Sequence, residues 1–248
     1  MDRIAVKNWD DALRCVVQVG WFNSESDRGC FGTGVIVNER QVLTADHVFL
    51  GCKERGHVAA FRLDPAFTPG AWSVKHRLAL QFTSRTDRDL CVLDFSEDFT
   101  TGRAHEIEPA MAIATNGVEP RGSIVDAYGC PPVHLSSESS KTEIMLAGML
   151  HLRRHVIDAA EHEIVVSYPN PHGMSGGPLF NRFGALVGIA SRSGTSDHHS
   201  EGVANVGYSR YAGVADLLET GQPPVLMDAS ARPPTRQELG AAPRRRSR

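Results

Sequence analysis

One short segment of the chain has the composition of a nucleophile's loop. Residues 172–179 read His-Gly-Met-Ser-Gly-Gly-Pro-Leu, so Ser175 lies among glycines just after a stretch that contains two prolines. A serine hydroxyl attacks a carbonyl only where a base takes its proton and hydrogen-bond donors receive the developing negative charge. If Ser175 is a nucleophile, the chain must also supply a base and an acid that orients the base.

Both partners occur upstream of Ser175. His47 ends an apolar run that begins at Leu43, and Asp89 opens the apolar run Leu90 to Leu93. The order His47, Asp89, Ser175 is one of three unrelated orders in which a triad of these residue types occurs. Each order belongs to a different fold, so the order by itself narrows the choice of architecture.

Three motifs give the chain a resemblance to the trypsin/chymotrypsin-like serine protease family. They are Leu-Thr-Ala-Asp-His at 43–47, Asp-Leu-Cys-Val-Leu at 89–93 and Gly-Met-Ser-Gly-Gly-Pro at 173–178, and the resemblance covers roughly Leu13 to Glu219. Segments 32–37 and 177–181 are similar to the high-temperature-requirement branch of the bacterial trypsin-like peptidases. We expect no PDZ domain of the kind found in that branch, because too few residues follow Glu219.

The resemblance implies a role for each residue of the site. Ser175 would attack the scissile carbonyl and form an acyl-enzyme. His47 would carry the proton, and Asp89 would hold the imidazole in the right tautomer. The backbone amides of Gly173 and Ser175 would form the oxyanion hole.

The resemblance also implies substrate-binding residues near Ser175. Pro169 stands where trypsins carry the aspartate that binds arginine or lysine side chains. Ile189, Ala190, Ser191 and Arg192 would form the opposite wall of the pocket and pair with the substrate backbone. A cationic P1 side chain then has no partner, so we expect small or apolar P1 residues. An acidic P1 preference is the alternative, and it would place Arg192 or His198 in the pocket.

Strand signals dominate the rest of the chain, in short runs divided by Gly, Pro, Asn and Ser that are typical of an all-β sandwich or barrel. With the resemblance, we expect two six-stranded antiparallel Greek-key β-barrels, a chymotrypsin-like double barrel, with a C-terminal helix over Tyr211–Glu219. The N-terminal barrel would occupy residues 1–110, the C-terminal barrel and helix residues 111–222, and a disordered basic tail residues 223–248. The predicted strands are Leu13–Phe22, Phe31–Val37, Gln41–Ala45, His57–Arg62, Trp72–Phe82, Leu90–Phe95, Ser123–Tyr128, Glu143–Leu152, Glu163–Tyr168, Ala185–Arg192 and Val203–Ser209.

The composition is that of an ordinary globular protein and limits its partners. The 248 residues are 41% hydrophobic and 22% charged, and the net charge is −3 although Ala231 to Arg248 contains six arginines. The residues before Ala231 are therefore more acidic than the whole chain, and this argues against nucleic-acid binding. No segment is long and apolar enough to cross a bilayer, so no membrane contact is expected. The expected partner is a polypeptide substrate.

The cysteines and histidines indicate neither a metal site nor a cofactor. Five cysteines lie far apart without a CxxC motif. Secreted relatives carry a cysteine directly after the catalytic histidine, where this chain has Val48. Together with a charged N-terminus that does not look like a signal peptide, this favours a cytoplasmic location, with a Cys30–Cys52 disulfide left as an alternative. The histidines interpreted as surface residues rather than metal ligands are His151, His155, His198 and His199.

Met174 replaces the aspartate that trypsin-like zymogens pair with a newly cut N-terminus. A methionine cannot form that ion pair, so we expect no activation by N-terminal cleavage. The loop Ser167–Met174 must then become ordered by its packing, by substrate or by an activating protein partner. Two functions remain open: a serine endopeptidase, or a catalytically silent or latent protease-fold module that binds extended peptides or a protein partner.

Overall fold

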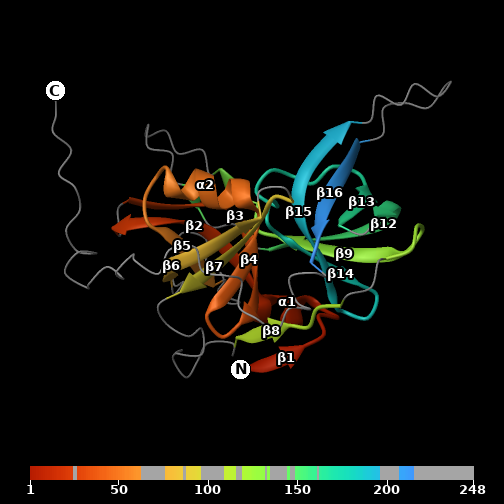
Figure 1. The fold of residues 1–248 in the computed structure, drawn as a ribbon, viewed down its shortest axis with the longest axis horizontal. Coiled ribbons are helices and arrows are strands. Elements are labelled where there is room, and N and C mark those ends of the chain that lie inside the picture. Colours follow the sequence, from red (N-terminus) through yellow and green to blue (C-terminus); the bar gives the residue numbers. More distant parts are fainter. Residues whose placement is uncertain are drawn as a thin grey trace.

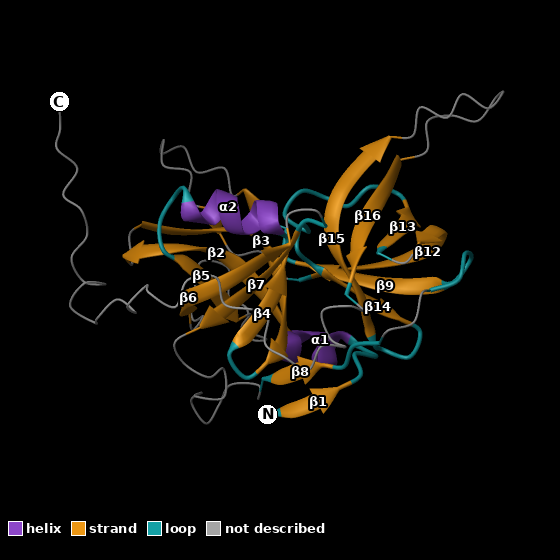
Figure 2. Ribbon diagram, in the orientation of Figure 1, coloured by secondary structure: helices purple, strands orange, loops and turns teal. Residues whose placement is uncertain are grey.

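Strands make up most of the described chain and close into two barrels that lie side by side (Figures 1 and 2). The computed structural model describes residues 1–24, 27–62, 76–85, 88–95, 109–115, 119–131, 133–134, 144–145, 149–160, 162–195 and 207–214. The predicted all-β double barrel is confirmed. The predicted tail, residues 223–248, lies outside the described residues.

The two barrels have the same connectivity. The first closes in the order β2-β3-β4-β7-β6-β5 and the second in the order β9-β12-β13-β16-β15-β14. Counted along the chain, each barrel therefore has the strand order 1-2-3-6-5-4, which is a Greek-key arrangement of antiparallel strands. The first barrel consists of β2 (Val16–Ser24), β3 (Asp27–Asn38), β4 (Gln41–Thr44), β5 (Val58–Arg62), β6 (His76–Arg85) and β7 (Leu90–Phe95). The second consists of β9 (Ile124–Gly129), β12 (Leu150–Ala160), β13 (Glu163–Ser167), β14 (Pro178–Asn181), β15 (Leu186–Thr195) and β16 (Gly207–Gly213).

Short elements complete the described chain. Helix α1 (Trp9–Cys15) precedes the first barrel, and helix α2 (Asp46–Lys53) follows β4. Strands β1 (Asp2–Ile4) and β8 (Ala110–Ala112) form a parallel pair below the barrels (Figure 1). Strands β10 (Val133–His134) and β11 (Ile144–Met145) form a short antiparallel pair.

The predicted start of the C-terminal helix, at Tyr211, is wrong. Tyr211 to Gly213 continue strand β16, which pairs with β13 and β15, and residues 215–219 of the expected helix lie outside the described residues. Of the apolar residues whose helical spacing suggested a helix, Tyr211 pairs with Ile164 of β13 on one side and with Ala190 of β15 on the other. The predicted strand from Leu13 also begins too early, because Leu13 to Cys15 form the last turn of α1.

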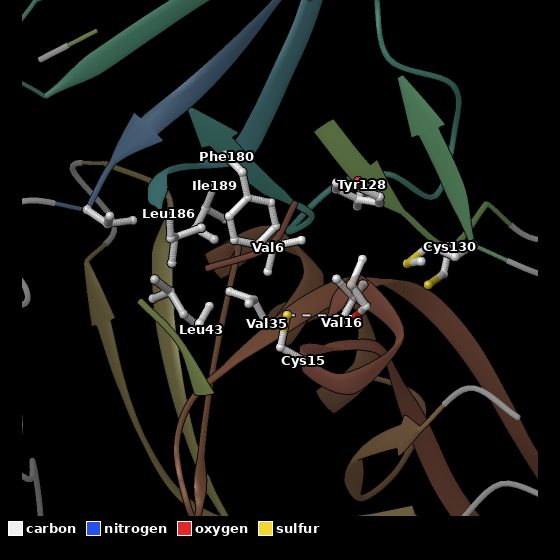
Figure 3. Close-up of a cluster of buried hydrophobic side chains, with 14 of the residues drawn as sticks. Val6, Cys15, Val16, Val35, Leu43, Tyr128, Cys130, Phe180, Leu186 and Ile189 are labelled. Atoms are coloured by element: carbon white, nitrogen blue, oxygen red, sulfur yellow. Dashed lines mark hydrogen bonds between the residues drawn. The ribbon is translucent and has the colours of Figure 1, made fainter. Parts of the chain in front are cut away.

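An apolar core joins the two barrels. Its members come from α1 and the first barrel on one side, such as Val16 and Val35, and from the second barrel on the other, such as Phe180 and Ile189 (Figure 3). Each barrel also has a core of its own. The N-terminal segment reinforces the junction, because the Val6 amide donates to the Gly184 carbonyl at 2.8 Å. The relative placement of the barrels is thus set by buried apolar contact.

All five cysteines are buried free thiols, Cys30 and Cys52 among them. No helix in the described part of the chain has the length and apolar character needed to cross a membrane.

Candidate active site

Asp89 and His47 form a close pair at the open end of the first barrel. Asp89 Oδ2 lies 2.7 Å from His47 Nδ1, and Asp89 Oδ1 accepts the backbone amide of His47 at 3.0 Å. The N-cap of helix α2 is Ala45, which has no side-chain acceptor, so the carboxylate of Asp89 takes over the capping of the helix. Asp89 itself has a left-handed backbone with φ of 55°, which few residues other than glycine, asparagine and aspartate adopt.

The surroundings of Asp89 keep its carboxyl ionised. Burial by itself would raise the pKa of Asp89, but hydrogen bonds from the His47 ring, the Ser191 hydroxyl and the His47 amide outweigh it and lower that pKa. The Ser191 hydroxyl donates to Asp89 Oδ2 at 2.7 Å. An ionised acceptor at Nδ1 leaves Nε2 of His47 as the nitrogen able to accept a proton. The His47 side chain is 41% exposed, so the ring remains accessible to solvent.

The loop that carries Ser175 is ordered by its own packing. Met174 is fully buried and packs in the core of the second barrel. The Met174 amide donates to the Pro171 carbonyl at 3.3 Å, and Gly173 has φ of +88°, as the third residue of a type II turn requires. Packing, one of the three ways in which this loop could become ordered, is therefore observed in the structure.

The backbone amides around Ser175 differ in their hydrogen bonding. The amide of Gly176 donates to Ala190 at 2.8 Å and that of Gly177 to Met174 at 2.9 Å. Among the described residues, the amides of Gly173 and Ser175 have no such acceptor. A pair of unsatisfied amides beside a serine hydroxyl is the arrangement that binds an oxyanion.

Thr33 of the first barrel holds the loop of the second. Its hydroxyl donates to the Gly173 carbonyl at 3.0 Å and accepts the Cys130 amide at 2.8 Å. Its backbone amide donates to the Ser175 carbonyl at 2.8 Å, and its carbonyl accepts the Thr44 hydroxyl at 2.6 Å. Thr33 is completely buried, so all of these bonds are made away from water.

Ser175 also lies close to the start of helix α2. A Cβ added at Gly32 would stand 2.7 Å from both the Ser175 carbonyl and a Val48 methyl, and Val48 follows His47. Within the described chain, the Ser175 hydroxyl makes no hydrogen bond, to His47 or to any other residue. Such hydrogen bonds are often long in enzymes without substrate and shorten when the substrate binds.

A pocket of about 280 Å³ opens beside Ser175. Of the substrate-binding residues predicted from sequence, Ala190, Ser191 and Arg192 line it. Pro169 and Ile189 are not among the described residues that line it: Pro169 packs beside Gly207, and Ile189 is completely buried in the core between the barrels. His198 lies outside the described residues.

Sequence reasoning missed several residues of the site. Asn170 and His172 line the pocket, and Asn170 donates to the Tyr211 hydroxyl at 2.7 Å. Thr33 was also missed. Its only signal in the sequence is its place between two glycines, and Gly32 is needed because Ser175 approaches its backbone closely.

The described residues contain no group of three or more histidine, cysteine or acidic side chains that could hold a metal ion. His151 Nε2 instead lies 2.7 Å from Asp126 Oδ1, and the His151 ring stacks on Tyr128 with the ring centroids 4.5 Å apart.

Comparison with known proteins gives one result on the family. A family model described as a trypsin-like peptidase domain matches residues 32–189, which is more than half of the chain. The matched segment contains His47, Asp89 and Ser175. None of the curated proteins matches the chain.

Proposed function

The chain belongs to the trypsin-like peptidase family, and on that basis we propose that it is a serine endopeptidase that cleaves peptide bonds through an acyl-enzyme. The observation that supports this most strongly is the position of the Asp89 carboxylate. This carboxylate accepts hydrogen bonds from His47 Nδ1 and from the Ser191 hydroxyl. Ser191 also lines the pocket beside Ser175. One acid therefore links the base to the wall of the nucleophile's pocket.

The proposed reaction uses only groups of this chain, the peptide and water. The Ser175 oxygen forms a bond to the scissile carbonyl carbon while His47 Nε2 takes the hydroxyl proton. The amides of Gly173 and Ser175 donate to the oxyanion. His47 returns the proton to the leaving amine as the peptide bond breaks. Water then hydrolyses the ester by the same proton transfers and frees Ser175.

The pocket beside Ser175 gives the proposal a specificity. Its described lining holds Arg192 and no carboxylate. A lysine or arginine side chain at P1 would therefore meet a like charge and no partner, which disfavours it. We expect poor cleavage after lysine or arginine. Small or apolar P1 residues fit this lining, and an acidic P1 residue, the alternative from the sequence, has Arg192 as a partner.

A fluorophosphonate probe tests the activation of Ser175, because it reacts only with an activated serine. We expect covalent labelling of the wild-type protein and cleavage of a denatured protein substrate. Ser175→Ala should lose both. Ser123→Ala, on the same barrel but distant in sequence from the loop, is the matched control and should keep both. The measurements are intact mass and gel-based fragment detection.

A different outcome would identify the alternative function. If the wild-type protein binds extended peptides but neither labels nor cleaves over a range of pH, the endopeptidase proposal fails. The protein would then be the silent or latent module, and the distance between the His47 ring and the Ser175 hydroxyl would be its structural cause.

A further inference from the structure

A second and larger cleft lies next to the pocket of Ser175. Its volume is about 600 Å³, and it is lined by Arg88 and Asp89 of the first barrel and by residues of the second. It shares Ser191 and Arg192 with the pocket beside Ser175. A polypeptide whose scissile bond lies at Ser175 therefore has its neighbouring residues at this cleft.

The lining of this cleft is rich in arginine. Among the described residues that line it are three arginines, Arg88, Arg192 and Arg210, and two carboxylates, those of Asp89 and Glu163. Both carboxylates already have strong partners. Asp89 is held by His47 and Ser191, as described above. Glu163 accepts two hydrogen bonds from Arg210, at 2.6 and 2.8 Å.

Arg192 is placed where its charge is unfavourable for the protein alone. It is paired directly across from Arg210 in the ladder between β15 and β16. Like charges opposite one another destabilise a sheet, and Glu163 compensates only Arg210. Arg192 is exposed and has no ion pair with any other residue of the described ranges. A bound anion would remove this repulsion.

A β-bulge gives Ser191 and Arg192 different surroundings, although the two residues are neighbours in the chain. The register of β15 against β16 shifts between Ala190 and Arg192, which marks a β-bulge at Ser191. Bulges redirect side chains and are frequent next to active sites. Here Ser191 bonds Asp89, while Arg192 lies on the wall common to both cavities.

We propose that this cleft binds a carboxylate of the polypeptide substrate close to the scissile bond, with Arg192 as the main contact. The inference rests on the proposed endopeptidase function and specifies its substrate class as acidic segments. A guanidinium matches a carboxylate with two parallel hydrogen bonds, which an uncharged side chain cannot reproduce. The carboxylate comes from an aspartate or glutamate side chain or from the end of the peptide chain.

Binding to Ser175→Ala protein tests the cleft without requiring catalysis. Paired fluorescent peptides carry glutamate or glutamine at one position, moved stepwise through four positions on each side of the expected cleavage point. Fluorescence anisotropy then gives the Kd of each pair. We expect about tenfold tighter binding of the glutamate peptide at one or two adjacent positions, and a smaller ratio at high salt.

Variants assign the effect to the cleft. Arg192→Gln should bring the ratio of the glutamate and glutamine Kd values close to one, and Arg192→Lys should leave an intermediate ratio. Arg182→Gln removes the same charge from an exposed arginine stacked on Phe183 and should leave the ratio unchanged. Peptides with free or amidated C-termini separate the two sources of the carboxylate: a gain that follows the free terminus assigns the cleft to chain ends.

The outcomes separate this inference from the proposed function. Equal Kd values for glutamate and glutamine at every position, or a ratio unaffected by Arg192→Gln, would overturn the carboxylate site even if the wild-type protein is labelled by the phosphonate. Clearly different Kd values for the glutamate and glutamine peptides, in a protein that the fluorophosphonate never labels, would instead support the carboxylate site and reject the endopeptidase function.

Discussion

The two barrels have the same strand order but hold their parts of the site in different ways. The first barrel contains the whole acid–base pair, because Asp89 contacts the ring and the backbone of His47 within one barrel. The second barrel carries Ser175, yet the loop of Ser175 is bonded to Thr33 of the first. The contacts between Asp89 and His47, the proposed acid–base half, are therefore self-contained, whereas the geometry of the proposed nucleophile half depends on the docking of the barrels.

The largest effect should come from the self-contained half. In Asp89→Asn the amide oxygen can keep the bond from the His47 backbone amide, which places the NH2 group at His47 Nδ1 and holds the ring in the wrong tautomer. We expect kcat to fall on the order of 10⁴-fold with little change in KM. Steady-state kinetics on a peptide ester or amide measures this. An effect smaller than about tenfold would mean that Asp89 does not orient the base.

A smaller but more informative effect should come from the docked half. Thr33→Val keeps the shape of the side chain but removes the donor to Gly173 and the acceptor for Cys130. Because a misplacement of about 1 Å can reduce rates about a hundredfold, we expect kcat to fall roughly 10- to 100-fold. The buried groups left without partners should also lower the free energy of unfolding by about 1 to 3 kcal/mol.

Thr33→Ser is the matched control, because it keeps the hydroxyl and loses one methyl. It should recover most of kcat. If both variants lose stability equally but keep the kcat of the wild type, Thr33 is only a structural contact between the barrels.

We expect the smallest effect from Ser191, a side chain of the second barrel that bonds Asp89. Ser191→Ala removes one of the hydrogen bonds that lower the pKa of Asp89, so that pKa moves up toward its ordinary value. A carboxyl with a lowered pKa stabilises the fold above its unfolded pKa of about 3.9, and this stabilisation is lost as the pH falls through the folded value. Unfolding curves of Ser191→Ala should thus match the wild type more closely at pH 3 than at pH 7.

Steady-state kinetics provide a second test of Ser191→Ala. We expect kcat to fall by about tenfold or less at neutral pH, since Asp89 keeps both contacts to His47. A loss as large as that of Asp89→Asn would contradict the view that the acid–base half is self-contained.

The sequence indicated the residues of the candidate site more clearly than the helices and contacts that hold those residues in place. His47, Asp89 and Ser175 each carry a local motif, and the strand runs divided by turn residues indicated an all-β sandwich or barrel. The choice of two barrels came from the family resemblance. Helix α2 was missed because it is short and begins within the apolar run that contains His47. The spacing of Tyr211 and Val214 was read as helical, but pairing with β13 and β15 overrides such a local preference.

Thr33 could not be found in this way, because its contacts are not local. Its hydroxyl donates to the carbonyl of Gly173, 140 residues away, and its backbone amide donates to the carbonyl of Ser175. Neither contact leaves a pattern in the chain near Thr33. The like-charge pair of Arg192 and Arg210 is hidden for the same reason, since it exists only after β15 and β16 pair.

The left-handed backbone at Asp89 restricts how this position can change in evolution. The residue must supply a short carboxylate and must also tolerate φ of 55°. Glycine and asparagine accept the backbone but have no negative charge, while glutamate has the charge on a longer arm and a less suitable backbone preference. Every single replacement thus loses one of the two properties, so a lineage that departs from aspartate here has no gradual route that retains the acid–base pair.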